Sequence, residues 1–298
     1  MSKHSSVAII AHNRKSMGGG LAQLRQILAD QGVDDPQWYE VPKSKLVPDR
    51  VERARKRGAT LIFAWGGDGT VQRCIDAMVG HPGVLAILPA GTANLLATNL
   101  GIPTDLEQAV VTGLRGHDRV LDVGRINGEH FAVMAGTGLD ALMIRDADRG
   151  LKDRFGRAAY VWTGARHVRH ELTPTTIWVD GDPWFDGEAS CVLIGNVGTI
   201  SGGITAFDDA RPDDGKLDLA VVTANGLVQW VRTLTRAAVG HTDRSPLVQM
   251  TTATRIKIAT TRKLPYELDG GDRNKTDRLK IKVVPNAITI RVPALVGS

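Results

Sequence analysis

The sequence predicts two domains, an N-terminal α/β domain with a mostly parallel sheet and a C-terminal domain of mainly antiparallel strands. The chain has 298 residues, which is comfortable for two hydrophobic cores. In the first half, short apolar runs alternate with helical patterns, as is typical of a parallel sheet covered by helices on both faces. After about residue 120 the β-like runs become irregularly spaced, which favours antiparallel pairing.

The first domain is expected to alternate strands and helices along the chain. Continuous apolar runs predict strands at residues 7–11, 38–41, 61–65 and 84–88. Apolar residues at helical spacing and one charged segment predict helices at residues 21–29, 51–57, 71–79 and 106–114. We place the boundary near residues 115–130 and assign residues 1–122 to this domain.

The second domain, residues 123–286, is expected to be rich in β structure. Its β-like runs lie at residues 133–135, 176–179, 189–195, 217–222, 256–259 and 281–284. The pair Asp180-Gly181 lies between two such runs and predicts a hairpin turn. Helical patterns remain at residues 155–168 and 228–239.

The composition excludes several classes of protein. The chain is 42% hydrophobic and 23% charged, and Cys74 and Cys191 lie in apolar runs, which indicates buried thiols in a reducing compartment. The sequence has no signal-peptide pattern and no run near the roughly 18 apolar residues of a membrane span, so we expect a cytoplasmic protein, peripheral at the membrane at most. A net charge of +5 favours anionic partners, but aromatic residues are too few and scattered for nucleic acid.

A glycine-rich turn, Gly66-Gly67-Asp68-Gly69-Thr70, follows the third predicted strand and precedes a helix. Backbone N–H groups in such a turn can converge on a phosphate, and side chains with Cβ atoms would block that approach. Asp68 adds a carboxylate that can orient Mg²⁺. The alternative is a tight βα turn in which Asp68 or Thr70 caps the helix.

Two common phosphate motifs do not explain this turn. The chain has no G-x-x-x-x-G-K-[ST] sequence and therefore no Walker-A site. Residues 136–141 fit G-x-G-x-x-A, but no acidic residue follows about 20 positions later, where Tyr160 lies.

A second glycine turn, Gly91-Thr92-Ala93-Asn94, follows the next predicted strand. Neighbouring parallel strands end at the same edge of a sheet, so the two turns are expected to meet there. One turn would hold phosphates while the other closes over a nucleotide. Alternatively, Asn94 caps a short helix.

Together the two turns resemble those of the diacylglycerol-kinase catalytic family, which includes sphingosine and ceramide kinases and soluble bacterial lipid kinases. The resemblance covers nearly the whole chain. It begins with Asn13-Arg14-Lys15-Ser16-Met17, which is similar to the family's Asn-Pro-x-Ser-Gly loop, and includes the segment 136–141. It continues through Asp213-Asp214-Gly215-Lys216-Leu217-Asp218 to Leu268-Asp269-Gly270-Gly271, which is similar to the family's Asp-Gly-Glu element. NAD kinases share the first glycine turn, and the later segments favour lipid kinases.

The resemblance implies an α/β nucleotide-binding domain, a C-terminal β-sandwich and a final strand near 287–298 that returns to the first domain. It implies ATP and Mg²⁺ in a cleft between the domains. The nucleotide contacts that it implies come from Asn13, Lys15, Ser16, Gly66, Gly67, Asp68, Gly69, Thr70, Gly91, Thr92 and Asn94.

The resemblance also implies two sets of acidic residues. Asp269 would accept the proton of the lipid hydroxyl and Asp68 would help to place Mg²⁺; the alternative for Asp269 is a hairpin turn. Asp213, Asp218 and the carbonyl of Lys216 would hold a second, structural Mg²⁺, and the alternative is a simple β-turn.

The chain departs from the family pattern in four places. Arg14 replaces a proline and Met17 a glycine, Leu95 stands where many members carry Asp, and Gly271 replaces the usual Glu. The last change removes one carboxylate beside Asp269.

The sequence therefore predicts an ATP-dependent lipid kinase that phosphorylates the hydroxyl of a lipid such as diacylglycerol or a sphingoid base. The alternatives are a NAD kinase and a nucleotide- or lipid-binding sensor without turnover. Besides the lipid, the candidate partners are an anionic membrane, contacted by the basic amphipathic segment 155–168, and a second copy of the chain. The alternative for this segment is a helix whose apolar side packs on the core while its charges face solvent. No local motif encodes the acceptor lipid.

Overall fold

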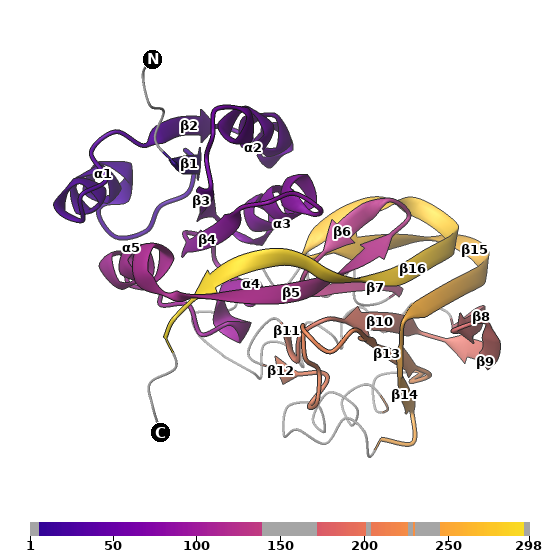
Figure 1. The fold of residues 1–298 in the computed structure, drawn as a ribbon. Coiled ribbons are helices and arrows are strands. Elements are labelled where there is room, and N and C mark those ends of the chain that lie inside the picture. Colours follow the sequence, from indigo (N-terminus) through magenta and orange to yellow (C-terminus); the bar gives the residue numbers. More distant parts are fainter. Residues whose placement is uncertain (1–5, 139–171, 201–203, 226–228, 230–244, 295–298) are drawn as a thin grey trace. The chain divides into compact units, whose positions relative to one another are not determined.

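The computed structural model describes residues 6–138, 172–200, 204–225, 229 and 245–294. The chain divides into two compact units, Met1–Leu121 with Asn286–Ser298, and Asp122–Pro285. The predicted boundary after residue 122 lies one residue from this division. The chain passes between the units twice, within strands β5 and β16 (Figure 1).

The first unit contains a parallel sheet. Its strands lie in the order β4, β3, β1, β2, and their bounds are β1 (Val7–His12), β2 (Gln37–Val41), β3 (Leu61–Gly66) and β4 (Val84–Pro89). The end of β16 (Gly271–Val292) joins this sheet beside β4, where Thr289 pairs with Val84 and Ile290 with Leu85 in parallel. The chain therefore ends in the sheet of the first unit, where a final strand near 287–298 was expected to return.

Helices cover both faces of this sheet, as the alternating pattern predicts (Figure 1). One face is covered by α1 (Gly20–Asp30) and α5 (Leu106–Arg115), whose Leu24 and Val110 pack with Phe63 and Trp65 in one core. The other face carries α2 (Val47–Lys56) and α3 (Asp68–Met78), which contact each other and the strands. Two short elements complete the unit, the 3₁₀ turn η1 (Ser44–Leu46) and α4 (Leu95–Asn99).

Local chemistry explains why α5 begins and packs where it does. Asp105 precedes the helix, and its carboxylate accepts a hydrogen bond of 2.9 Å from the N–H of Gln108, which is the usual arrangement of an N-cap. Gly113 faces the sheet, where an added Cβ would lie 2.2 Å from the ring of Phe63. The helix therefore approaches the sheet closely because this position lacks a side chain.

The second unit is a mainly antiparallel β-sandwich. Its main strands run in the order β14, β13, β10, β7, β15, β16, with the hairpin β8–β9 paired to β15 and the hairpin β5–β6 paired to β16. The strand bounds are β5 (His117–Ile126), β6 (Glu129–Phe131), β7 (Met134–Gly138), β8 (Thr173–Val179), β9 (Asp182–Ala189), β10 (Cys191–Gly195), β11 (Thr199–Ile200), β12 (Ile204–Thr205), β13 (Leu217–Val222), β14 (Val248–Ala253) and β15 (Arg255–Leu268).

Alternation along these strands builds the core of the second unit. Ile256 and Ile258 on β15 and Leu279 and Ile281 on β16 are buried together, while their neighbours in sequence point to solvent. The predicted turn at Asp180-Gly181 is confirmed, because φ is positive at both residues and Val179 pairs with Asp182.

Several strands of the second unit were not predicted, among them β9, β14 and the hairpin β5–β6. The helices predicted at 155–168 and 228–239 lie outside the described residues. Cys74 and Cys191 are buried and free, as predicted, and burial raises the pKa of the Cys74 thiol to about 12. Within the described ranges, no helix is long and apolar enough to cross a membrane.

Candidate functional site

The two glycine turns lie against each other at one edge of the parallel sheet, as predicted. Gly66 and Pro89 are paired at the ends of β3 and β4, and the N–H of Ala90 donates to the carbonyl of Gly66 at 3.0 Å. A Cβ added to Gly91 would lie 2.4 Å from the Cα of Gly67, which is closer than real Cβ contacts. The two backbones can approach this closely only because both positions are glycine.

The glycines of the first turn meet different requirements. A Cβ at Gly66 would lie 2.5 Å from the side chain of Thr70, which is buried and whose hydroxyl lies 3.2 Å from that of Ser44. The Thr70 side chain therefore packs under the turn rather than facing solvent. Gly69 is exposed, and a Cβ there would meet open space. It lies in the first turn of α3, where backbone N–H groups have no acceptor within the helix.

Asp68 connects the first glycine turn to the second. Its Oδ1 accepts a hydrogen bond of 2.6 Å from the N–H of Leu95, the first residue of α4. Burial raises the pKa of Asp68, and hydrogen bonds from backbone N–H groups, that of Leu95 foremost, act in the opposite direction. Asp68 thus supports the start of the helix that follows the second turn, whereas α3 itself has Gly67 at its N-cap position and no side-chain capping bond there.

Asn94 closes the second turn on itself. Its backbone is left-handed, with φ of 49°, and its Oδ1 accepts from the N–H of Gly91 at 2.9 Å. Its Nδ2 donates to the carbonyls of Pro89 and Gly91 at 3.2 and 2.8 Å. The side chain makes no capping bond to α4, so the alternative of a side-chain cap is wrong. Thr92, between these residues, is exposed.

The loop after β1 carries the exposed side chains of Asn13, Lys15 and Ser16. Because β1 is the parallel neighbour of β3, this loop leaves the sheet at the same edge as the first glycine turn. The indole Nε1 of Trp65 donates to the carbonyl of Lys15 at 3.1 Å, which fixes the loop. Met17 is buried in the core that α1 and α5 share with the sheet, which accounts for a large residue where the family has glycine.

Asp269 lies in a two-residue hairpin turn between β15 and β16, which is the alternative to a catalytic role that the sequence left open for it. Asp269 and Gly270 have φ of 46° and 78°, and Leu268 pairs with Gly271. The Asp269 side chain is buried and accepts three backbone hydrogen bonds. Its Oδ2 accepts from Ala132 at 2.8 Å, and its Oδ1 accepts from Val133 and Met134 at 2.9 Å each.

These bonds hold the hairpin to the segment that precedes β7. The N–H of Asp269 also donates to the carbonyl of Met134 at 2.9 Å. Both carboxylate oxygens already accept from buried N–H groups, so protonation of Asp269 would weaken at least one of these hydrogen bonds. A structural role for Asp269 follows directly from this geometry, and its role as proton acceptor stays a prediction.

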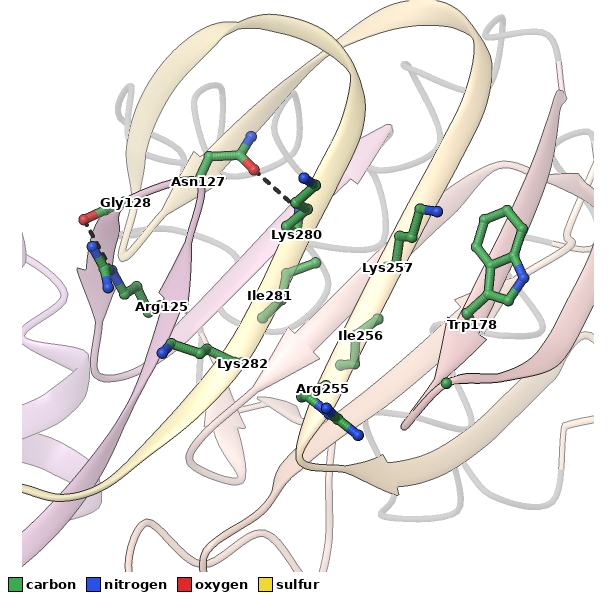
Figure 2. A pocket seen from close by; sticks show the side chains of 11 residues that line it. Arg125, Asn127, Gly128, Trp178, Arg255, Ile256, Lys257, Lys280, Ile281 and Lys282 are labelled. Atoms are coloured by element: carbon green, nitrogen blue, oxygen red, sulfur yellow. Dashed lines mark hydrogen bonds between the residues drawn. The ribbon is translucent and has the colours of Figure 1, made fainter.

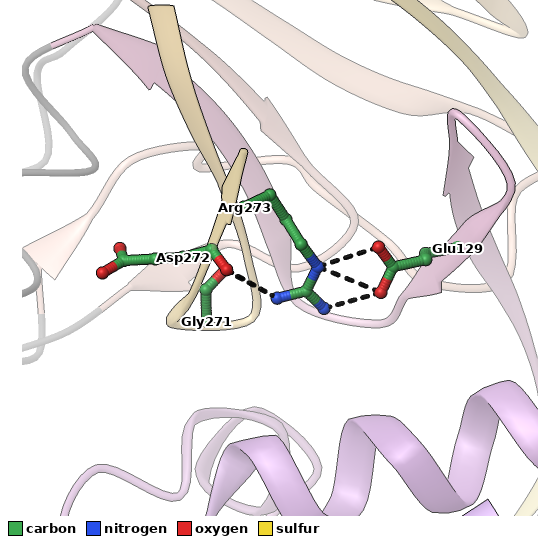
Figure 3. Close-up of polar contacts among 4 residues, drawn as sticks. All are labelled: Glu129, Gly271, Asp272 and Arg273. Atoms are coloured by element: carbon green, nitrogen blue, oxygen red, sulfur yellow. Dashed lines mark hydrogen bonds and ion pairs between the residues drawn. The ribbon is translucent and has the colours of Figure 1, made fainter. Parts of the chain in front are cut away.

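An arginine stands beside the position where the family carries glutamate (Figure 3). The Arg273 guanidinium pairs with Glu129, with Nε 2.9 Å from Oε1 and Nη2 2.8 Å from Oε2, and its Nη1 donates to the carbonyl of Gly271 at 3.0 Å. A Cβ at Gly271 would lie 2.9 Å from that Nη1. The exposed carboxylate of Asp272 points away from this pair. This pair leaves no local signal in the sequence, because Glu129 and Arg273 are far apart in the chain.

The segment 213–218 consists of a turn and the first two residues of β13, Leu217 and Asp218. Gly215 has φ of +75°, its N–H donates to Asp122 at 2.6 Å, and the N–H of Lys216 donates to Asp214 at 3.0 Å. Asp213 is exposed and Asp218 is half-buried. Burial, followed by the negative charges of Asp214 and Asp209, raises the pKa of Asp218 to about 6.

The chemistry of this segment fits a divalent cation, since carboxylate and carbonyl oxygens are hard donors and Asp214 and Asp209 add negative charge near Asp218. However, the part of the chain that the structure describes contains no group of three or more His, Cys, Asp or Glu side chains arranged to hold a metal ion. Fewer than three carboxylates would therefore have to be completed by carbonyl oxygens or water.

Comparison with known families and relatives covers both units. The diacylglycerol kinase catalytic domain matches residues 9–126, and the YegS C-terminal NAD kinase β-sandwich-like domain matches residues 133–292. The chain is 30% identical over 227 residues to a diacylglycerol kinase of Bacillus subtilis (strain 168), covering 74% of this chain and 73% of that protein. It is 28% identical over 284 residues to a YegS-like protein of Klebsiella pneumoniae (strain 342), covering 93% of each.

Solved structures share the fold at lower identity. A crystal structure of a diacylglycerol kinase from Bacillus anthracis str. Sterne has a TM-score of 0.73 at 23% identity and covers 98% of both chains. An NAD kinase from Archaeoglobus fulgidus has a TM-score of 0.51 at 8% identity, covering 96% of this chain and 93% of that one. The two family matches and the relatives agree with the paired glycine turns, and the chain belongs to the diacylglycerol kinase family of phosphotransferases.

Proposed function

We propose that the protein transfers the γ-phosphate of ATP to the hydroxyl of a lipid such as diacylglycerol or a sphingoid base. The observation that carries the proposal is the close contact of Gly67 and Gly91, in a chain that belongs to this kinase family. Two turns that meet without side chains leave backbone N–H groups as the nearest partners of a phosphate. The free buried cysteines and the co-substrate ATP favour the cytoplasm as its location.

Several residues at this edge of the sheet would each contribute a different contact to the nucleotide. Gly69 lies exposed in the first turn of α3, whose N-terminus favours negative charge. The exposed Lys15 and Ser16 follow β1 at the same edge and can reach phosphate oxygens. Asp68 would hold Mg²⁺, which supplies neutralisation of the phosphate charge when bound with ATP.

A second metal would be structural. Asp213, Asp218 and the carbonyl of Lys216 would hold it, and the raised pKa of Asp218 would be reversed by the added positive charge. A drop in melting temperature on adding EDTA, absent in Asp218→Asn, is the expected result. An unchanged melting temperature in the native protein contradicts this site.

One observation favours a second candidate function, a nucleotide- or lipid-binding protein without turnover. The family's glutamate is Gly271 here, and a guanidinium paired to Glu129 stands over it. Proton acceptance would then depend on Asp269, whose oxygens already accept three backbone bonds. A proton acceptor typically contributes about 10²–10⁴-fold to a rate, so weak turnover is one consequence of this arrangement.

Labelled ATP offered in parallel with diacylglycerol, a sphingoid base, a polyprenol and NAD separates these functions. Label in a lipid, and not in NAD, is the expected result. Label in NAD alone would establish the NAD kinase alternative. ATP binding by calorimetry with transfer to none of the four would establish the protein without turnover.

A further inference from the structure

The second unit carries a basic groove that the proposed kinase chemistry does not use (Figure 2). The groove has a volume of about 840 Å³ and lies across β15 and β16, between the β5–β6 turn and the β8–β9 turn. Its lining combines five cations with one indole ring, namely Arg125, Arg255, Lys257, Lys280, Lys282 and Trp178.

The cations are placed by the register of two paired strands. Arg255 lies opposite Lys282, and Lys257 lies opposite Lys280, so like charges face each other directly across β15 and β16. The residues between them, Ile256 among them, are buried, so the strand alternation sends all four cations to the same outer face. Like charges directly opposite each other destabilise a sheet, so this arrangement has a cost in the free protein.

Carboxylates offset little of this charge. The carboxylate of Asp180 lies beside Arg255, whose N–H donates to its Oδ1 at 2.8 Å, and it offsets part of that one charge. Of the five cations, none forms an ion pair with an acidic side chain among the described residues, and the four on β15 and β16 are exposed. Arg273 and Arg291 on the same strand β16 differ, because each pairs with a carboxylate at 2.8 Å. The groove therefore concentrates positive potential, which an anionic ligand would neutralise.

Trp178 adds an amphipathic ring at the side of the groove. The ring is half-buried, and the Lys257 ammonium lies 4.6 Å from its centroid. Tryptophan rings are favoured where an apolar body meets a polar, hydrated layer, as at the headgroup level of a membrane.

We propose that this groove docks on the anionic phospholipid headgroups of a membrane surface. The inference rests on the proposed function, because a lipid acceptor resides in a bilayer that the enzyme must reach. Five exposed cations, four on β15 and β16 and one on β5, suit an array of separate headgroups. The segment 155–168, predicted from the sequence to contact membranes, lies outside the described residues and contributes none of the groove residues named above.

Other occupants fit the groove less well. A second copy of the chain would bring the same cations together across a two-fold interface, with no acidic patch in the groove to receive them. A single-stranded nucleic acid would require several stacking rings, and the groove offers only Trp178. Vesicle binding distinguishes both of these occupants from a membrane surface.

The test compares two triple variants of equal charge change. Lys257→Gln/Lys280→Gln/Lys282→Gln removes three groove cations, and the control Lys43→Gln/Lys45→Gln/Lys263→Gln removes three exposed lysines elsewhere. Each basic residue near an anionic surface contributes about fivefold to binding, so three should contribute about 10²-fold. Co-sedimentation at low salt uses phosphatidylcholine vesicles with and without phosphatidylglycerol.

We expect the native protein and the control to bind the anionic vesicles, the groove variant to bind about 10²-fold more weakly, and none to bind the neutral vesicles. Brominated lipids should quench less fluorescence in Trp178→Phe than in the native protein. Equal loss in both triple variants would overturn the proposal. So would native protein that binds inositol hexakisphosphate or oligonucleotides but not anionic vesicles, or that dimerises through these lysines.

Phosphotransfer to a soluble short-chain diacylglycerol separates this proposal from the kinase itself. The groove variant should retain that activity within about twofold, since it changes no residue assigned to ATP or catalysis. Loss of this activity together with vesicle binding would make the groove part of the substrate site and overturn the docking role. Native protein without any transfer but with groove-dependent vesicle binding would refute the kinase proposal alone.

Discussion

Replacing Asp269 by alanine removes one buried acceptor from three backbone N–H groups at once. Those of Ala132, Val133 and Met134 each donate to its carboxylate at 2.8–2.9 Å. A hydrogen bond to a charged group contributes about 1.5–3 kcal/mol, and water entering the gap recovers part of that loss. Alanine at the left-handed φ of 46° costs about 1 kcal/mol more. We therefore expect Asp269→Ala to lower the free energy of unfolding of the second unit by about 3–5 kcal/mol.

The assay must report on the second unit separately, because a chain of two units need not unfold in one step. Hydrogen exchange of the amides of residues 132–134 gives that local report, and urea unfolding gives the total. A unit of this size loses about 2–4 °C in melting temperature per kcal/mol, so we expect a decrease of about 6–20 °C. Asp269→Asn tolerates the left-handed backbone and keeps one acceptor, so it should lose about half as much.

The same pair of variants decides between the structural and catalytic roles. A loss of less than about 1 kcal/mol in Asp269→Ala, with unchanged exchange at residues 132–134, would refute the reasoning from hydrogen bonds. Asp269→Asn that keeps its fold and ATP binding but transfers no phosphate would establish Asp269 as the proton acceptor. Full turnover in that variant would exclude it from the mechanism.

Three further predictions concern single positions. Gly91→Ala should lower the melting temperature and weaken ATP binding at least about tenfold in calorimetry, because its Cβ would lie 2.4 Å from the facing glycine of the first turn, whereas Gly69→Ala, whose Cβ meets open space in the protein, should leave the melting temperature unchanged. Gly271→Glu restores the family's carboxylate at a position whose backbone conformation accepts any residue, and it should raise turnover by up to about 10²-fold. An unchanged rate, or the same rise in Gly271→Ala, would contradict this prediction. Asp180→Ala should cost about 1–2 kcal/mol in urea unfolding at neutral pH and Asp180→Asn less than half of that. Hydrogen bonding, first from the Thr254 hydroxyl, lowers the pKa of Asp180, so its contribution is present above the ordinary Asp pKa and is lost as pH falls below about 4; a constant difference between native and variant down to acid pH would contradict this.

The sequence predicted the parts of the fold that depend on local pattern. The four strands and flanking helices of the first unit follow from apolar periodicity, and the turn at Asp180-Gly181 follows from two residues that tolerate positive φ. The length of β16 did not follow, because polar residues over 272–278 interrupt its apolar pattern in an exposed part of the hairpin. Tertiary pairing with β15 decides that segment, not its own propensity.

The candidate site likewise has parts that could be predicted from the sequence and parts that could not. The meeting of the glycine turns follows from parallel strands that end at one edge, so the sequence could predict it. The hydrogen-bond partners of the two carboxylates could not be predicted from the sequence. Those of Asp269 lie at residues 132–134, and that of Asp68 is Leu95. The guanidinium above Gly271 depends on Glu129 in another hairpin, and no local signal links the two.

The late arrival of β16 in the first sheet has a consequence for synthesis on the ribosome. Strand β4 ends at Pro89, but the neighbour that covers its edge begins pairing at Thr289, about 200 residues later. At typical elongation rates of about 5–20 residues per second, that edge waits roughly 10–40 s for its partner. An uncovered strand edge is a template for wrong pairing. A nascent chain of this protein is therefore expected to engage chaperones until its last strand emerges.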